Sequence, residues 1–525
     1  MNRGRIGIET YPEYKKRVID VISPSYCAAK WYNATIWLGH GQTTSCHHPP
    51  GHWIPLDELK DNPSAIHNTP HKKLMRKMMQ EGERPSECEY CWKVEDMGKG
   101  HISDRTFKTE IFTDEDIKKT ATMPWEENVN LKTLEISFDR ACNFKCSYCN
   151  PAFSTAWVKD INDYGGYQNI QSDGRGHFQD TAPWAEPATR KQEDNPYIQA
   201  FHKWWESDLA DSLEEIRITG GEPIMHKGTW KLFDWFENNP GRNREMRFAI
   251  NSNLCPETPK VFDKLIEKSH NIPNLHIYTS MEATGIQGEY IRDGLDYKYW
   301  MENIHRLLKE GNVSQLFMMM TINSLCLNSI TEFLDEMLDL REEYGKLAPV
   351  MTLNILRFPS FQSAAILPQE IKSHYKDILE KWLLSARPQS MLDEGEKESV
   401  IRLIDYLDIV KTPHKDTAET PKLYNDFKSW NTKTIVMAFL GILVGLSISF
   451  LNPATQNDNL WFVFLCGMIS VTGMALPGFS GSFILILLGN YVLLLVDSVN
   501  VLFDTFVFMV SGDFSFISDP QHLRL

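Results

Sequence analysis

Three cysteines in one short segment carry the strongest chemical signal in the sequence. Cys142, Cys146 and Cys149 stand in RACNFKCSYCNP with the spacing C-x3-C-x2-C. Three thiolates on one loop suit three irons of a four-iron cubane and leave the fourth iron open to a ligand that reacts. A structural zinc site needs four closed ligands, and no fourth is supplied locally. The spacing therefore favours a reactive iron–sulfur site over a zinc loop or buried thiols.

Four further cysteines in the first 125 residues form a second candidate site. They are Cys27, Cys46, Cys88 and Cys91, in the pattern C-x13-G-x4-C followed by C-x2-C. In a reducing compartment such clustering indicates metal ligation or redox chemistry. Four thiolates can close one iron–sulfur cluster or hold structural zinc, and the sequence leaves both open. Substitute zinc ligands stand in the segment HHPPGH, namely His47, His48 and His52, although prolines make a rigid loop the simpler interpretation.

Short apolar runs must position these side chains. Six strand-like runs span residues 131–138, 213–219, 245–253, 274–280, 315–323 and 350–358. Segments of helical period lie between the later runs, at residues 230–239, 259–269, 299–311 and 329–346. Alternating strand and helix predicts parallel βαβ units. We therefore expect an α/β fold, a partial (β/α)6 TIM-like barrel, with chemistry at the carboxyl ends of its strands.

A long insertion, residues 151–212, separates the first two runs. It is rich in Trp, Gly, Asp and Gln. Two interpretations stay open: a cover over the barrel mouth, or a surface excursion.

The cysteine triad and the strand ends resemble the radical SAM superfamily. The second run ends in ITGGEP, which matches the family's GGE motif. The resemblance implies a [4Fe-4S] cluster on the triad that chelates S-adenosylmethionine and, on reduction, cleaves it to a 5′-deoxyadenosyl radical. It also implies a reductant such as flavodoxin or ferredoxin. The residues that the resemblance assigns to S-adenosylmethionine are Tyr148, Gly220, Gly221, Glu222, Ser252 and Ser280.

The N-terminal cysteine pattern resembles the SPASM/twitch auxiliary-cluster module of radical SAM enzymes. In those enzymes the module usually follows the barrel, whereas here it precedes it, within a resemblance that covers residues 1–415. The likeness implies one auxiliary cluster and a peptide substrate, with a small molecule as the alternative.

Charge divides the chain into two parts. The net charge of −15 argues against bulk electrostatic binding of nucleic acid, so we expect no nucleic-acid partner.

The last 95 residues contain only Lys433, Arg524 and five aspartates as charged residues. Residues 434–451 are free of charge and close to the roughly 20 residues that span a bilayer. The lysines before them, Lys422, Lys428 and Lys433, predict a front domain on the cytoplasmic side.

A second apolar stretch, residues 460–496, is broken at ALPGFSGSF. A helix break at membrane depth is tolerated where it is buried in protein or lines a cavity. MALPGFSGSFILILLGNYVLLL resembles a fragment of the undecaprenyl-phosphate translocase family, domain of unknown function 368. The alternatives are a plain hydrophobic anchor and a chance fusion of two reading frames.

The predicted organisation follows from these boundaries. It comprises a twitch-like module (1–125), a radical SAM core (126–411), a linker (412–433), a transmembrane segment with a broken α-helix (434–510) and a polar tail (511–525). The expected function is a membrane-located radical SAM enzyme whose catalytic domain is cytoplasmic and whose tail contacts lipid. The alternative is a polyprenyl-phosphate transporter fragment fused to a metal-binding domain.

Overall fold

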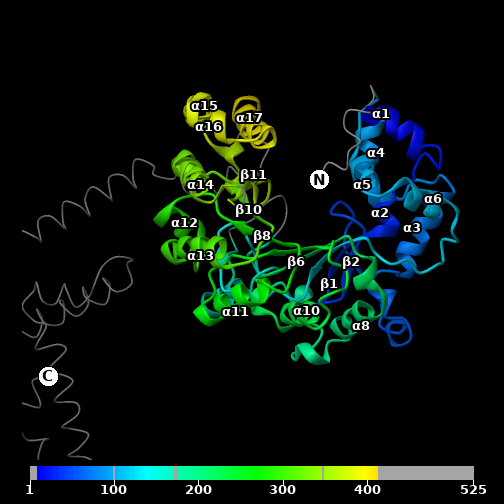
Figure 1. Cartoon of the computed structure of the whole chain (residues 1–525). Coiled ribbons are helices and arrows are strands. Elements are labelled where there is room, and N and C mark those ends of the chain that lie inside the picture. The colour runs from blue at the N-terminus through cyan, green and yellow to red at the C-terminus, as the bar shows by residue number, and fades with distance from the viewer. Residues whose placement is uncertain (1–8, 99–100, 169, 171–175, 346–347, 412–525) are drawn as a thin grey trace, which may run out of the picture. The chain divides into compact units, whose positions relative to one another are not determined.

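The computed structural model describes residues 9–98, 101–168, 170, 176–345 and 348–411 (Figure 1). They belong to one compact unit, residues 1–424. Among these residues no helix has the length and apolar character to cross a bilayer. The predicted linker, transmembrane segment and polar tail (412–525) lie outside the described residues.

All six predicted strands are present, which confirms the α/β class. They are β4 (Thr133–Ser137), β6 (Glu215–Thr219), β7 (Arg247–Asn251), β8 (Leu275–Ser280), β10 (Gln315–Ile322) and β11 (Val350–Ile355). They pair in parallel in the order β11-β10-β8-β7-β6-β4. Their carboxyl ends therefore meet at one edge of the sheet.

Three strands that the sequence analysis missed extend this sheet from the N-terminal region. They are β1 (Asn33–Trp37), β2 (Gln42–Thr44) and β3 (His52–Trp53). β1 pairs in parallel with β4, Ile36 opposite Ile136, and β2 and β3 follow antiparallel. The nine-stranded sheet stays open, with β11 at one end and β3 at the other.

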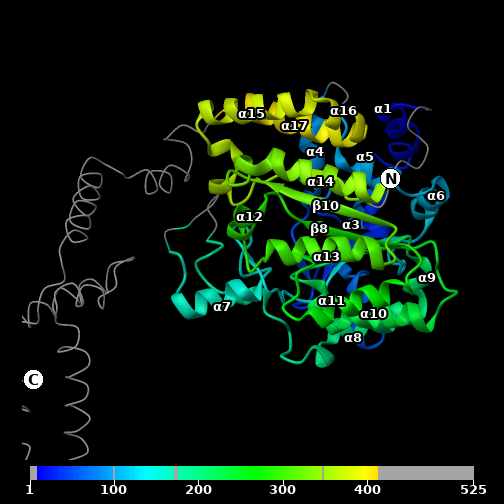
Figure 2. The same cartoon turned by 60° about the vertical axis from the view of Figure 1, so that its left-hand side comes forward.

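Helices α10, α11 and α13 lie side by side along the sheet in Figures 1 and 2, and the bounds of the described helices are as follows. Those of the N-terminal region are α1 (Tyr11–Tyr14), α2 (Ala29–Tyr32), α3 (Pro70–Gln80), α4 (Glu89–Asp96), α5 (Asp104–Glu110) and α6 (Asp114–Thr122). The insertion adds α7 (Thr155–Tyr164), α8 (Pro196–Trp204) and α9 (Ala210–Ser212). The others are α10 (Lys227–Asn238), α11 (Pro259–Ser269), α12 (Gly285–Ile291), α13 (Tyr297–Glu310), α14 (Ile330–Tyr344), α15 (Gln369–Leu384), α16 (Ala386–Met391) and α17 (Glu394–Ile409).

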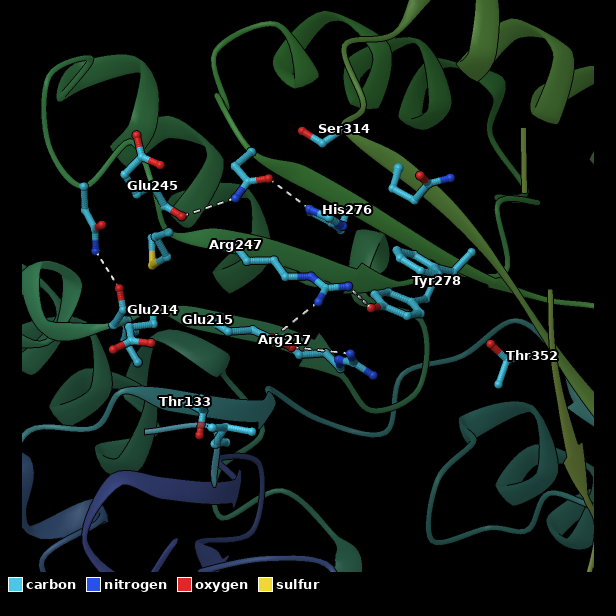
Figure 3. A pocket seen from close by; sticks show the side chains of 17 residues that line it. Thr133, Glu214, Glu215, Arg217, Glu245, Arg247, His276, Tyr278, Ser314 and Thr352 are labelled. Atoms are coloured by element: carbon cyan, nitrogen blue, oxygen red, sulfur yellow. Dashed lines mark hydrogen bonds and ion pairs between the residues drawn. The ribbon is translucent and has the colours of Figure 1, made fainter. Parts of the chain in front are cut away.

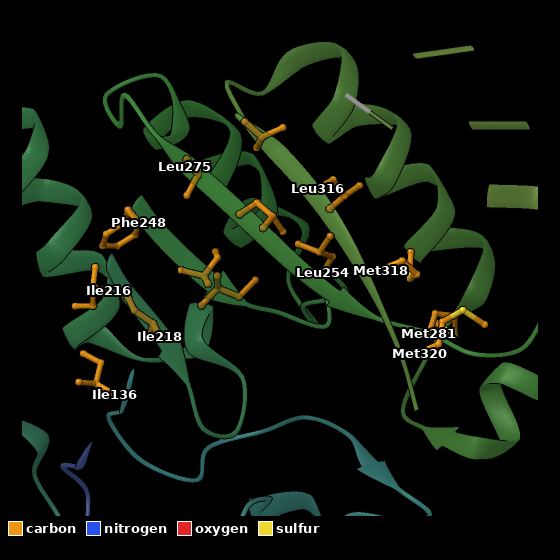
Figure 4. Packing of buried hydrophobic residues seen from close by; sticks show 14 of the residues in the cluster. Ile136, Ile216, Ile218, Phe248, Leu254, Leu275, Met281, Leu316, Met318 and Met320 are labelled. Atoms are coloured by element: carbon orange, nitrogen blue, oxygen red, sulfur yellow. The ribbon is translucent and has the colours of Figure 1, made fainter. Parts of the chain in front are cut away.

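Period-two alternation gives the strands two unlike faces. In β10 the side chains of Leu316, Met318 and Met320 are buried against the helical layer (Figure 4). The alternate residues, such as Thr321, point to the other face and are half-buried. One face thus builds the core, because apolar burial drives the packing, and the other is free to carry polar groups.

Helix α17 closes the free side of β11. The Glu396 carboxylate accepts the backbone N–H of Met351 at 2.9 Å, and Arg402 donates to the carbonyl of Leu353 at 2.6 Å. Arg341 of α14 holds Glu396 through two hydrogen bonds of 2.6 and 2.8 Å. Side chains thereby satisfy backbone groups that the last strand leaves unpaired.

Candidate iron–sulfur and S-adenosylmethionine site

The loop that follows β4 carries the cysteine triad. Cys142, Cys146 and Cys149 are partly buried on it. Lys145–Cys146 (β5) pairs antiparallel with Arg292–Asp293 (β9), and the N–H of Ser147 donates to the carbonyl of Ile291 at 2.8 Å. The segment after β8 therefore holds the cysteine loop at the carboxyl edge of the sheet.

The loop after β6, which contains the GGE motif, lies directly on the cysteine loop. The N–H of Glu222 donates to the carbonyl of Ala141 at 2.6 Å. A Cβ on Gly221 would lie 2.1 Å from that carbonyl, and Gly220 has a φ of +114°. Glycine is thus required because two backbones touch at this point.

Glu222 is a buried carboxylate held by hydrogen bonds. It is 2% exposed and accepts hydrogen bonds from Ser252 Oγ at 2.7 Å and from the N–H of Asn253 at 2.6 Å. Burial raises its pKa to about 7, although these hydrogen bonds lower it. No ion pair to Glu222 occurs among the residues described. Ser252 therefore lies against Glu222, while Ser280 lies half-buried at the end of β8.

The three thiols fit a cationic cluster. Burial raises the pKa of all three thiols, and that of Cys149 reaches about 12. The pKa of Cys142 is also raised by the nearby thiols of Cys146 and Cys149. Thiolates in such surroundings need nearby positive charge. The N–H of Phe144 points to Cys142 Sγ at 3.5 Å, and Arg292 donates toward Cys146 Sγ at 3.8 Å.

Two charged residues that the sequence analysis missed complete this side of the site. Glu282 is 1% exposed and accepts hydrogen bonds from Arg292 at 2.6 Å and from the Tyr148 hydroxyl at 3.1 Å. Arg292 also lies over the Tyr148 ring, 5.5 Å from its centroid. Glu282 could have been found from the sequence, because it lies two positions after Ser280, a residue that the resemblance assigns to S-adenosylmethionine. Nothing in the local sequence distinguishes Arg292.

The insertion covers the cysteine loop, which favours the first of its two interpretations. Trp157 donates to the carbonyl of Cys146 at 2.9 Å, and Thr155 exchanges hydrogen bonds with the backbone of Cys142. A cavity of about 550 Å³ opens between Cys142 and helix α7. Helix α8, in contrast, packs Phe201 and Trp204 into the main core and serves as the crossover between β4 and β6.

A larger cavity, of about 930 Å³, lies at the amino ends of the strands (Figure 3). Arg217 lies over the Tyr278 ring at 4.1 Å, and Tyr278 stacks on Phe317 with centroids 4.4 Å apart. Arg247 donates to the Tyr278 hydroxyl, and Glu215 lies 3.4 Å from Arg217 and 3.7 Å from Arg247. The cavity is thus lined by cations stacked on aromatic rings.

The four N-terminal cysteines also converge. The pKa of Cys27 is raised to about 11, first by burial and then by the nearby thiols of Cys46 and Cys91. Cys88 has a pKa raised to about 12, first by burial and then by Cys27 and Cys46. Four residues that span 65 positions of the chain therefore form one buried thiol cluster.

Neither cysteine set is arranged around a single tetrahedral ion. Around one zinc, thiolate sulfurs lie about 3.8 Å apart. Within the described residues, the one group of three or more metal-binding side chains whose ligand atoms all lie within 4.8 Å is His47, His48 and Asp104. His52 instead contacts Thr69 at 3.0 Å, so the three candidate histidines do not join the cysteines.

Comparison with solved structures finds matches of low sequence identity, with TM-scores near 0.3. Native anSMEcpe with bound AdoMet and a peptide shares 12% identity with a TM-score of 0.29, over 48% of this chain and 59% of that chain. Streptococcus suis SuiB bound to S-adenosylmethionine shares 13% identity with a TM-score of 0.30, over 66% and 68% of the two chains. The chain thus spans about three fifths of the length of the anSMEcpe structure.

The tail has a family match of its own. The profile of the VCA0040-like family, described as undecaprenyl phosphate translocase-like, matches residues 417–517. This match confirms the resemblance predicted from the sequence. No curated protein matches the chain. By these comparisons the chain has solved structures with bound S-adenosylmethionine among its low-identity matches, and its residues 417–517 match the translocase-like family.

Proposed function

We propose that the front part of this chain is a radical SAM enzyme with a partial-barrel core that modifies a peptide. The observation that carries the proposal is the contact between two loops: the cysteine triad after β4 and the buried Glu222 after β6, joined through the carbonyl of Ala141. Parallel strands bring these loops to one edge, where the Cys142 thiol lies close to the Glu222 carboxylate.

Cys142, Cys146 and Cys149 would hold a [4Fe-4S] cluster that, with S-adenosylmethionine bound and one electron supplied, provides a 5′-deoxyadenosyl radical. Glu222 would bind the methionyl amino group, since a buried carboxylate gains most from a cation. Ser252 and the N–H of Asn253 hold that carboxylate in place. Tyr148, fixed by Glu282, would face the adenine. Gly220 and Gly221 permit the close approach, and Ser280 is proposed as a ribose contact.

The N-terminal thiol cluster is proposed to hold a twitch-type auxiliary iron–sulfur cluster. Its four cysteines close every position of a cubane, so its role would be electron transfer or substrate anchoring. A flavodoxin or ferredoxin would supply the electron, and the tail would tether the enzyme to the cytoplasmic face of a membrane.

The test is anaerobic reconstitution of the full-length chain with iron and sulfide, followed by reduction with S-adenosylmethionine present. We expect 5′-deoxyadenosine from the wild-type protein and none from the triple variant Cys142→Ala/Cys146→Ala/Cys149→Ala. Cys255→Ala is the matched control, because Cys255 is buried yet lies outside both cysteine sets. Undiminished cleavage in the triple variant would overturn the proposal.

A second candidate function rests on the family match at residues 417–517. The tail would then bind a polyprenyl phosphate, and the front part would be an appended metal-binding domain. Binding of undecaprenyl phosphate by the full-length chain, unchanged in the triple cysteine variant and accompanied by no cleavage of S-adenosylmethionine in the wild type, would favour this function.

A further inference from the structure

In the HHPPGH loop, the side chains of His47 and His48 point to Asp104 of helix α5. His48 Nε2 lies 2.7 Å and His47 Nε2 lies 3.3 Å from the same carboxylate oxygen, Oδ2 of Asp104. Ligand atoms from all three residues lie within 4.8 Å of one another. Asp104 stands 56 positions beyond His48, so the fold, and not sequence proximity, makes this group.

The ligands are held in place by their neighbours. The His48 ring stacks on Tyr90 with centroids 3.9 Å apart and planes 16° from parallel, and it lies 4.1 Å from the His47 ring. Asp104 is the first residue of α5, which fixes its backbone. A site whose rings and backbone are already ordered loses little conformational freedom when an ion binds.

We propose that His47, His48 and Asp104 bind one divalent transition-metal ion of the Zn²⁺ class. Two imidazole nitrogens and one carboxylate oxygen are ligands that zinc accepts, and three protein ligands leave a position for water or another molecule. That position is accessible, because His47 is exposed and a cavity of about 660 Å³, lined by His48, Glu87 and Tyr90, adjoins the site.

Cys46 precedes His47, so zinc on the thiols must be distinguished from zinc on this group. The two ligand sets differ in bond length: about 2.3 Å for zinc to sulfur and about 2.0–2.1 Å for zinc to nitrogen or oxygen. X-ray absorption at the zinc edge measures these distances whether or not the enzyme is active.

The experiment uses the full-length protein with its iron–sulfur sites reconstituted, treated with a chelator and then given Zn²⁺ alone. After gel filtration, we expect one zinc per chain and a nitrogen/oxygen shell without sulfur. Asp104→Asn and His48→Ala should each lower zinc affinity by about tenfold or more, with iron content unchanged. His270→Ala is the matched control, since the His270 ring is exposed and, among the residues described, contacts the carbonyl of Glu310.

Three results would overturn the proposal. They are no zinc above the level of a chelator-treated blank, a sulfur shell around the zinc, and equal zinc affinity in the wild type, Asp104→Asn and His48→Ala. Because iron content is measured on the same samples, a variant that fails to fold is recognised by loss of both metals, and His47→Ala then replaces it.

Discussion

The guanidinium of Arg292 donates to the carboxylate of Glu282 at 2.6 Å, and its other amino group lies 3.8 Å from the thiol of Cys146. Arg292 and Glu282 are both almost fully buried. This pair therefore places a fixed positive charge beside one candidate cluster ligand. It also holds Tyr148, because Arg292 lies over its ring and Glu282 accepts a hydrogen bond from its hydroxyl.

Replacing Glu282 with Gln should leave the Arg292 charge buried without its partner. Removal of one member of a buried ion pair costs about 3–5 kcal/mol, so the denaturant midpoint should fall clearly. Glu302→Gln is the control, because Glu302 makes an exposed i,i+4 pair with Lys298. Equal midpoints for the two variants would show that the buried pair contributes no more than a surface one.

Gly221→Ala should disrupt the cysteine loop. The added methyl would lie 2.1 Å from the carbonyl of Ala141, so the two backbones must separate. We expect loss of iron bound at the triad and a lower melting temperature. Gly241→Ala is the control, since nothing lies within 4 Å of its Cβ position. Full iron content in Gly221→Ala would contradict the close packing of the two loops.

Glu222 should make stability depend on pH. Its pKa is raised from 4.5 to about 7 by burial, so the folded protein binds this proton more tightly than the unfolded chain. The stability that this proton contributes is therefore fully present below pH 4.5, and the free energy of unfolding falls as the pH rises from 4.5 to 7. Glu222→Gln cannot ionise and should escape this loss, on the order of 3 kcal/mol. Urea unfolding of metal-free protein at pH 5 and pH 7.5 measures the difference; parallel changes in both proteins would refute it.

The N-terminal thiol cluster should account for half of the iron. Two four-iron cubanes give about eight irons per chain, and Cys88→Ser/Cys91→Ser should lower this to about four. Cys326→Ser, outside both sets, should keep all eight. One zinc per chain on sulfur, with about four irons in the wild type, would instead assign zinc to Cys27, Cys46, Cys88 and Cys91.

The tail should anchor the chain to membranes. Residues 434–451 are uncharged, so transfer into lipid is favoured, and the preceding lysines oppose translocation of the front part. After cell fractionation, we expect the full-length chain in the membrane pellet, resistant to an alkaline wash and released by detergent. Recovery as a soluble, non-aggregated protein without detergent would contradict the anchor.

The sequence predicted the parallel core well because each strand there has a strong pattern. Leu316, Met318 and Met320 alternate with less buried residues, and Pro259 marks the start of α11 where the structure begins it. The strand ends also placed Glu222 near the triad, since parallel strands share one carboxyl edge.

The remaining features depend on contacts between distant segments, which local patterns do not encode. β1 is short, and its partner β4 lies 100 positions away; each strand alone is compatible with several neighbours. Arg292 reaches Cys146 only because β9 pairs with β5. Likewise, nothing local to HHPPGH indicates Asp104, so the sequence predicts only a rigid loop at His47 and His48.

The pairing of β1 with β4 bears on how the chain can be divided. A protein that starts at residue 126 would lack β1 and present the backbone of Thr133–Ser137 as an unpaired template on a mostly parallel sheet. Other molecules could add a strand to that template. The core without its N-terminal region is therefore expected to aggregate. The two parts cannot be exchanged between proteins as separate domains, although each has its own cysteine motif.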